Sequence, residues 1–169
     1  MKEAEESGDM LMYRAVFRRM LETNSTRIIQ NDSTSHAIIL IEELLNTAKQ
    51  TVYIYCSKLD EKVWSNPRVL NALVRALDRC VKFNVMTQEE VSNSNLAQKA
   101  LSERGCPASV AKSSFAKENF IVVDERAFRL EVDTGDRKGF ACANSPVNAT
   151  TLIEIFKKMK EDEPREKEG

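Results

Sequence analysis

Histidine and paired cysteines, the side chains that build most zinc sites, are scarce in this 169-residue sequence. Its one histidine is His36, and its four cysteines, Cys56, Cys80, Cys106 and Cys142, include no CxxC pair. This spacing predicts neither a structural zinc site nor a disulfide framework. We therefore expect four reduced thiols and no bound metal or cofactor.

Long hydrophobic runs are absent as well. The longest, such as residues 37–41, are far shorter than the roughly 20 residues that span a bilayer. After Met1 the chain reads Lys-Glu-Ala-Glu-Glu, which lacks the basic-then-apolar pattern of a secretion signal. These features predict a cytoplasmic protein without a membrane span.

The sequence also has no surplus of positive charge. Lysine and arginine total 25 against 26 aspartates and glutamates, which gives a net charge of −1. A domain that binds duplex DNA usually carries a basic surplus on one face, so strong nucleic-acid binding is not expected. With 42% hydrophobic residues, the chain is apolar enough to bury the core of one domain.

Helical periodicity begins after an acidic stretch of nine residues, which we expect to be frayed. From Met10 to Leu21 apolar residues recur at helical spacing, and Arg14, Arg18 and Arg19 are expected on the other faces. Residues 27–30 form a short candidate strand. The predicted organisation is an N-terminal helix and linker over residues 1–32, one domain over 33–160 and a charged tail over 161–169.

Strands and helices alternate through the first part of the predicted domain. Ser33 or Ser35 is placed to cap a helix with a clean apolar stripe, residues 51–56 read as a buried strand, and Asn66 with Pro67 begins the next helix. A strand over 81–86 and a helix that ends at Gly105 follow. This alternation predicts right-handed crossovers and a largely parallel sheet with helices packed against it.

The pattern changes after residue 107. Segments 120–123, 127–132 and 139–143 read as strands of an antiparallel meander. Pro146 then begins a last helix, whose apolar stripe is Leu152, Ile155, Phe156 and Met159. The predicted fold class is α/β, with a mixed, mostly parallel sheet, flanking helices and a C-terminal antiparallel meander.

This order of elements resembles one half of the phospholipase D superfamily. The signature of that family is HxKxxxxD in and after an apolar strand, followed by GSxN before a helix. Here residues 117–124 have the same spacing, with Lys117 at the histidine position, Asn119 at the lysine position and Asp124 retained. Residues 141–144 resemble the second element and end on Asn144. These four residues are the degenerate motif positions and the candidate site.

The resemblance implies a chemistry that this chain has lost. The family's mechanism uses two histidines, one from each half or protomer, as phosphorus nucleophile and as leaving-group acid. Lys117 cannot simply replace the first, because a lysine with its ordinary pKa near 10.4 is protonated at neutral pH. The resemblance therefore implies a catalytically inactive binding module that acts as a homodimer, its two copies meeting where an active enzyme has its site, with a phosphate-bearing ligand or a protein partner.

Two alternatives remain open on the sequence alone. One is an active phosphodiesterase or nuclease with a site reorganised around Lys117, Asn119, Asp124 and His36. The other is an interaction or sensor subunit that recruits a protein partner through its N-terminal helix. Simpler roles are also expected: Asp124 as a turn former, His36 as a solvated or capping residue, and Trp64 as an anchor of its loop.

Overall fold

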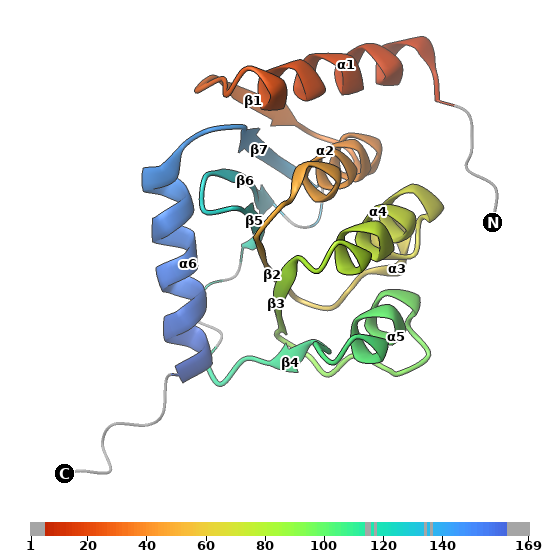
Figure 1. Cartoon of the computed structure of the whole chain (residues 1–169), viewed down its shortest axis with the longest axis vertical. Coiled ribbons are helices and arrows are strands. Elements are labelled where there is room, and N and C mark those ends of the chain that lie inside the picture. The colour runs from red at the N-terminus through yellow and green to blue at the C-terminus, as the bar shows by residue number, and fades with distance from the viewer. Residues whose placement is uncertain (1–5, 114–115, 117, 134, 136, 162–169) are drawn as a thin grey trace.

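A mixed sheet with helices on both faces forms the centre of the molecule (Figure 1). The computed structural model describes residues 6–113, 116, 118–133, 135 and 137–161. The helices are α1 (Gly8–Glu22), α2 (Thr34–Thr47), α3 (Glu61–Trp64), α4 (Pro67–Asp78), α5 (Leu96–Glu103) and α6 (Pro146–Glu161). The strands are β1 (Ile28–Asn31), β2 (Thr51–Cys56), β3 (Lys82–Thr87), β4 (Ser109–Val110), β5 (Asn119–Val123), β6 (Ala127–Asp133) and β7 (Lys138–Cys142).

The strands follow the order β1-β7-β6-β5-β2-β3-β4 across the sheet. The pairs β2–β3 and β3–β4 are parallel, and the pairs β2–β5, β5–β6, β6–β7 and β1–β7 are antiparallel. The α/β class, the mixed sheet and the C-terminal meander are confirmed. The parallel part is smaller than predicted, because α2 joins β1 to β2 at distant places in the sheet and only the later crossovers produce parallel neighbours.

The N-terminal segment contributes to this same sheet. The short strand expected at 27–30 is present at 28–31 and pairs with β7, with Ile28 opposite Cys142 and Asn31 opposite Gly139. Helix α1 packs against α2 on the outside of the molecule (Figure 1). The segment 1–32 that we expected to be a helix and a linker therefore includes an edge strand.

Side-chain caps begin the helices at the predicted positions. The Ser33 hydroxyl accepts from the His36 amide, and the Asn66 carbonyl oxygen accepts from the Arg68 amide with Pro67 in the first turn. The short helix α3 was not predicted, because four residues are too few to show helical periodicity. It buries Trp64, which confirms the expected anchoring role of that side chain.

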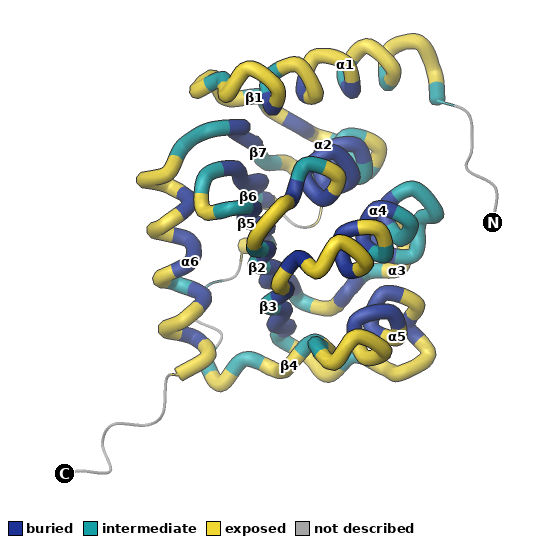
Figure 2. Tube along the Cα trace, viewed as in Figure 1, coloured by how far each residue is buried: buried dark blue, intermediate teal, exposed yellow. Residues whose placement is uncertain are grey.

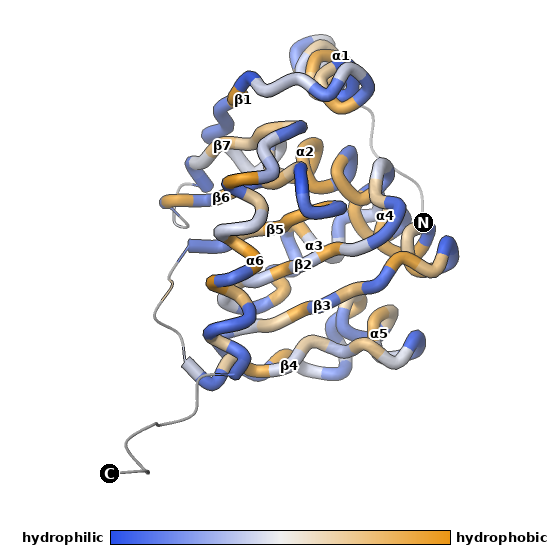
Figure 3. The backbone as a smooth tube through the Cα atoms, turned by 60° about the vertical axis from the view of Figure 1, so that its left-hand side comes forward, coloured by the Kyte–Doolittle hydropathy of each residue, from blue (hydrophilic) through white to orange (hydrophobic). Residues whose placement is uncertain are grey.

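Two hydrophobic clusters cover the two faces of the sheet. In the first, Leu40 and Leu44 of α2 and Leu73 of α4 pack against Val52 and Ile54 of β2. The second lies under α6. Its buried residues are Tyr55, Met86, Phe120, Val122, Phe128, Cys142, Ala149, Leu152, Ile153, Phe156 and Met159. Figures 2 and 3 show the central strands buried and largely hydrophobic between the helices. Among the described residues no helix is long and apolar enough to cross a membrane.

Helix α1 is fastened to α2 by a buried cluster of charges. Arg14 was expected on an outer face of α1, but it is buried, and its guanidinium lies 2.7 Å from Glu43 and 2.6 Å from Glu42. Arg18 donates two further hydrogen bonds to Glu43. Val16, expected in the buried stripe, is 43% exposed. The apolar spacing located the helix and most of its buried face, since Phe17 and Leu21 are buried and Tyr13 and Met20 pack against the core. It missed Arg14, which is buried because the carboxylates of α2 pair with it.

Part of the N-terminal stretch that we expected to be frayed is ordered. The Ser7 side chain accepts from the Met10 amide and caps α1, and Glu6 accepts two hydrogen bonds from Arg14. Residues 6–9 are therefore part of the α1 attachment, whereas residues 1–5 lie outside the described structure.

Glu42 and Glu43 should respond differently to neutralisation. Burial raises the pKa of Glu42, and its Oε1 has no hydrogen-bond partner of good geometry. The folded state thus binds the proton of the Glu42 carboxyl more tightly than the unfolded chain does. The free energy of unfolding therefore falls as pH rises from the ordinary pKa of a glutamate through the raised pKa of Glu42. We expect Glu42→Gln to keep or raise stability at neutral pH and to flatten this decline. Glu43→Gln should cost about 3 kcal/mol, because it removes the buried carboxylate that accepts from both Arg14 and Arg18. Urea denaturation across this pH range checks both, and equal losses in the two variants would contradict the assignment.

The docking of α6 can be tested at Phe156. This side chain is 2% exposed, and its ring contacts Tyr53 edge-on at a centroid distance of 5.2 Å. Phe156→Ala should cost about 3–5 kcal/mol through lost burial and the remaining cavity. Lys157→Ala, on the exposed side of the same helix, should change stability by no more than about 0.5 kcal/mol. Urea denaturation of both variants measures the contrast, and similar small losses would show that α6 is not docked.

Candidate functional site

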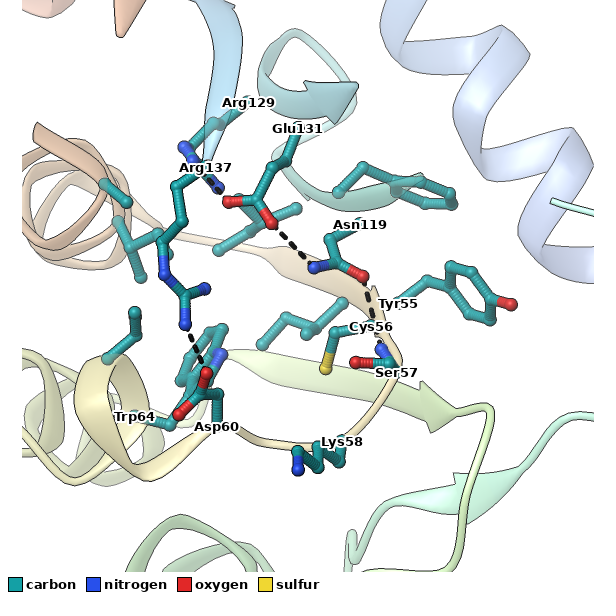
Figure 4. A pocket seen from close by; sticks show the side chains of 16 residues that line it. Tyr55, Cys56, Ser57, Lys58, Asp60, Trp64, Asn119, Arg129, Glu131 and Arg137 are labelled. Atoms are coloured by element: carbon teal, nitrogen blue, oxygen red, sulfur yellow. Dashed lines mark hydrogen bonds and ion pairs between the residues drawn. The ribbon is translucent and has the colours of Figure 1, made fainter. Parts of the chain in front are cut away.

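A polar pocket of about 130 Å³ opens where β2 ends and β5 begins (Figure 4). Because β2 and β5 are antiparallel, the last residues of one strand meet the first residue of the other at this end of the sheet. Ala37, Ile41, Val63 and Trp64 line the helical side. The polar lining is Ser57, Lys58, Asp60, Asn119, Arg129, Glu131 and Arg137.

Asn119 joins the two strands at the base of this pocket. Its side-chain carbonyl oxygen accepts from the Ser57 amide at 3.2 Å, and its Nδ2 donates to Glu131 Oε2 at 2.8 Å. Asn119 lies opposite Glu131 in the β5–β6 register, so both side chains leave the same face of the sheet. Both ends of the amide are thereby committed to holding the pocket wall.

A buried ion pair stands beside Asn119. Arg129 and Glu131 are 3% and 1% exposed, and Arg129 Nη2 donates to Glu131 Oε1 at 2.8 Å. The two residues are two positions apart on β6 and therefore point to the same face. Burial lowers the pKa of Arg129, but a guanidinium keeps its charge at neutral pH. Its Nε is buried without a hydrogen-bond partner.

The rim of the pocket carries a second ion pair. The Arg137 guanidinium donates to the Asp60 carboxylate, with Lys58 nearby (Figure 4). Burial opposes ionisation of Asp60, but the Lys62 amide and Arg137 together hold its pKa below the usual value. The named charged lining residues are therefore three cations and two carboxylates, an excess of one positive charge.

Cys56 is the one thiol in the pocket lining, and it is unreactive in this environment. Complete burial raises the pKa of Cys56 to about 12. A thiol with such a pKa stays protonated at neutral pH, and the thiolate is the nucleophilic form. The described residues also contain no group of three or more side chains arranged to hold a metal ion.

Of the three candidate positions that the structure describes, one lies at this pocket. Asn119 lines it, whereas Asp124 lies at the other end of β5 and the Asn144 side chain lies 3.4 Å from the Asn24 carbonyl oxygen. Lys117 lies outside the described residues. The four motif positions therefore do not form a cluster within the part of the chain that the structure describes.

Asp124 is a turn former, as its position suggested. Its carboxylate accepts from the backbone amides of Lys49 at 3.0 Å, Gln50 at 2.7 Å and Thr51 at 3.1 Å. Its φ of 53° lies in the left-handed region, which aspartate tolerates better than most side chains. The carboxylate thus joins the start of β2 to the end of β5.

His36 contacts none of the described candidate positions. It is in the first turn of α2 instead of before it, its ring stacks on Tyr13 at 4.1 Å, and its Nδ1 is 3.2 Å from the Asp32 carboxylate. It lines a different hollow, together with Asn31 and Phe140, between α2 and the β1–β7 edge. Its Nδ1 also accepts from the Asp32 amide at 3.4 Å, just before α2 begins. Of the two roles that we expected, solvated or capping, the half-buried ring therefore fits the capping one.

The residues that define the pocket were missed by the sequence analysis. Arg129, Glu131 and Arg137 received no role from the sequence. A signal was present, since Arg129 and Glu131 are two apart in a strand whose neighbours Phe128 and Leu130 are apolar. Two opposite charges at that spacing share one face, and burial of that face requires them to pair.

Comparison with known proteins finds likeness only at the level of structure. No protein-family model and no curated protein matches the chain. Nuc from Salmonella typhimurium, a phospholipase D family member, superimposes with a TM-score of 0.57 and 16% identity over 79% of this chain and 94% of its own. NucT from Helicobacter pylori gives a TM-score of 0.56 and 11% identity with the same coverage.

A third similar structure is TrmBL2, described as an archaeal chromatin protein with a novel mode of DNA binding. It superimposes with a TM-score of 0.57 and 11% identity over 89% of this chain, which spans 60% of that chain. Identities this low show a shared fold, and the likeness to Nuc and NucT supports a phospholipase D-like fold for this chain.

Asp124 offers a direct test of whether this position now serves structure alone. Asp124→Ala should cost about 2–4 kcal/mol, because it removes a charged acceptor from three amides and places alanine at a positive φ. Asp124→Asn, which keeps one acceptor oxygen and tolerates the backbone, should lose about half as much. Chemical denaturation gives both values. An unchanged stability in Asp124→Ala would show that the Asp124 carboxylate does not hold the start of β2 to the end of β5.

Proposed function

Because the chain has a phospholipase D-like α/β fold, we propose that it is a catalytically inactive binding module, with the pocket around Asn119 as its ligand site, and that it acts as a homodimer. One observation carries the first part of the proposal. The place where the motif spacing puts the family's lysine holds Asn119, which is bonded to Ser57 and to the buried Arg129–Glu131 pair.

The lining residues lack a working nucleophile and base. Cys56 is protonated, Asn119 is neutral, and arginine does not release a proton at neutral pH. Glu131 accepts from both Arg129 and Asn119, so its two oxygens are already occupied. No histidine is among the lining residues. General acid–base chemistry needs a group that can exchange a proton with the substrate, and the lining carboxylates Asp60 and Glu131 are each held in an ion pair with an arginine.

The ligand that fits this pocket best carries a phosphate or a similar small anion. Arg129 offers a buried donor, Arg137 and Lys58 add positive charge at the rim, and guanidinium groups bind phosphate oxygens in a fork. A volume of about 130 Å³ is below the range for whole drug-sized ligands, so the pocket accepts a head group instead of a large molecule.

A protein partner is the second candidate, and a specific observation favours it. Helix α1 exposes three large apolar side chains, Leu11, Met12 and Val16. Such side chains on one helix mark a contact surface more often than a solvated one. The DNA binding named for TrmBL2 is not carried over, because a net charge of −1 supplies no basic surplus.

Absence of turnover is the first prediction of this proposal. Purified protein should not hydrolyse bis-p-nitrophenyl phosphate, single-stranded DNA or double-stranded DNA, with or without divalent metal ions. The reason is that the pocket lining has no histidine and that its carboxylates are paired with arginines. Turnover that follows the protein through several columns and disappears in Asn119→Ala would establish the active phosphodiesterase in its place.

The binding role is tested with inorganic phosphate as probe. Calorimetric titration of the wild-type protein should give saturable binding, and phosphate at about 100 times its dissociation constant should stabilise the fold by about 2.7 kcal/mol. Arg137→Gln should bind at least about tenfold more weakly, because it loses a charge-assisted contact. Lys157→Gln, on the exposed side of α6, is the control and should bind phosphate as the wild type does. Equal binding in all three proteins would remove the pocket assignment.

A further inference from the structure

The outer face of α1 carries a regular stripe that no other part of the described chain covers. Asp9, Met12, Val16 and Arg19 are all exposed, and they are spaced by three, four and three residues. This is the spacing of the a and d positions of a heptad. The opposite face of the helix, with Phe17 and Leu21, is buried. We call the four exposed residues the α1 seam.

The ends of the seam carry opposite charges. Asp9 lies in the first turn of α1 and Arg19 in the last. Neither side chain has an ion-pair partner in the part of the chain that the structure describes. Between them Met12 is 68% exposed and Val16 is 43% exposed. The seam is therefore acidic at one end, apolar in the middle and basic at the other end.

We propose that the α1 seam binds the α1 seam of a second copy of this chain, with the two helices antiparallel about a twofold axis. In that arrangement Met12 of one copy packs on Val16 of the other, and Asp9 faces Arg19, because both pairs are centred on position 14. The interface is isologous, so each contact occurs twice. A parallel pair would instead place Asp9 against Asp9 and Arg19 against Arg19, which repel each other. Ala15, exposed beside the seam, leaves room for close approach of the helices.

The exposed apolar residues favour this surface over the ligand pocket. The large hydrophobic side chains exposed among the described residues are Leu11, Met12, Val16, Ile28, Leu96, Val110, Val132 and Val147. Three of them lie on α1, and none lines the pocket around Asn119. The inference rests on the homodimer proposed above, and it moves the contact from the site, where the resemblance had placed it, to α1. The pocket then stays open to its ligand.

The size of the seam sets the strength of the dimer. A helix of 15 residues is about 22 Å long, so one helix pair lies at the small end of specific interfaces. A micromolar dissociation constant is therefore expected, as for other small interfaces. The dimer should also weaken as salt screens the Asp9–Arg19 contacts.

Charge reversal tests the pairing and its direction. By sedimentation velocity the wild-type protein should reach about twice its mass of 19.2 kDa as concentration rises. Asp9→Arg and Arg19→Asp should each raise the dissociation constant by about tenfold, because two attractive contacts become repulsive. The double variant should restore the wild-type constant. Lys157→Glu, a charge reversal on the exposed side of α6, is the control and should leave the dissociation constant unchanged.

Cross-linking gives an independent measurement of register. In a Cys80→Ser background, which removes the exposed native thiol, Met12→Cys protein mixed with Val16→Cys protein should form a disulfide-linked dimer under mild oxidation. Either variant alone should cross-link far less, because neither position faces itself. Efficient linkage of each variant with itself and none in the mixture would overturn the antiparallel register.

The remaining outcomes separate this inference from the proposed function. A dimer that is unaffected by both charge reversals overturns the α1 seam while leaving the homodimer in place through another surface. A wild-type protein that stays monomeric up to about 1 mM overturns the seam and the homodimer together. The phosphate titration still decides the binding role of the pocket in either case, since its variants do not touch α1.

Discussion

The antiparallel pairing of β2 with β5 is the interaction on which the rest of the structure depends. β2 lies between β3, its parallel neighbour, and β5, so it joins the crossover half of the sheet to the meander half. Side chains secure the pairing at both ends: Asn119 bonds the Ser57 amide, and Asp124 bonds the amides that lead into β2. Asn119 and Asp124, two of the four candidate positions, thus fix the register of this pairing.

The same pairing determines what the pocket can contain. It brings the end of β2 beside Asn119 and carries the Arg129–Glu131 pair of β6 against the helical layer. Buried charges are stable only when paired and hydrogen-bonded, so a site built this way holds its charges in fixed contacts. Proton transfer requires the opposite, a group whose proton is free to move. These fixed contacts agree with the binding role proposed above.

Local features of the fold were predictable from the sequence. Ser33 and Asn66 cap helices where they were expected, and Phe156 lies at the centre of the buried stripe of α6. Periodicity and capping depend on near neighbours, which the sequence displays directly. The order of strands, the burial of Arg14 and the Arg129–Glu131 pair depend on residues brought together from distant segments. A charge in the sequence looks the same whether it faces water or a partner, so only the tertiary arrangement reveals the site.

The pairing of β1 with β7 has a consequence for the order in which the protein can form. Ile28 is opposite Cys142, so one edge of the sheet joins strands from near the two ends of the described chain. During synthesis β1 must wait until β7 has also left the ribosome, while β2, β3 and the helices between them can associate earlier. Pairing between such distant segments slows folding, because closing a long loop costs entropy before any contact repays it. Until then the newly made chain carries an unpaired strand bearing Ile28, a segment for chaperones to protect from aggregation.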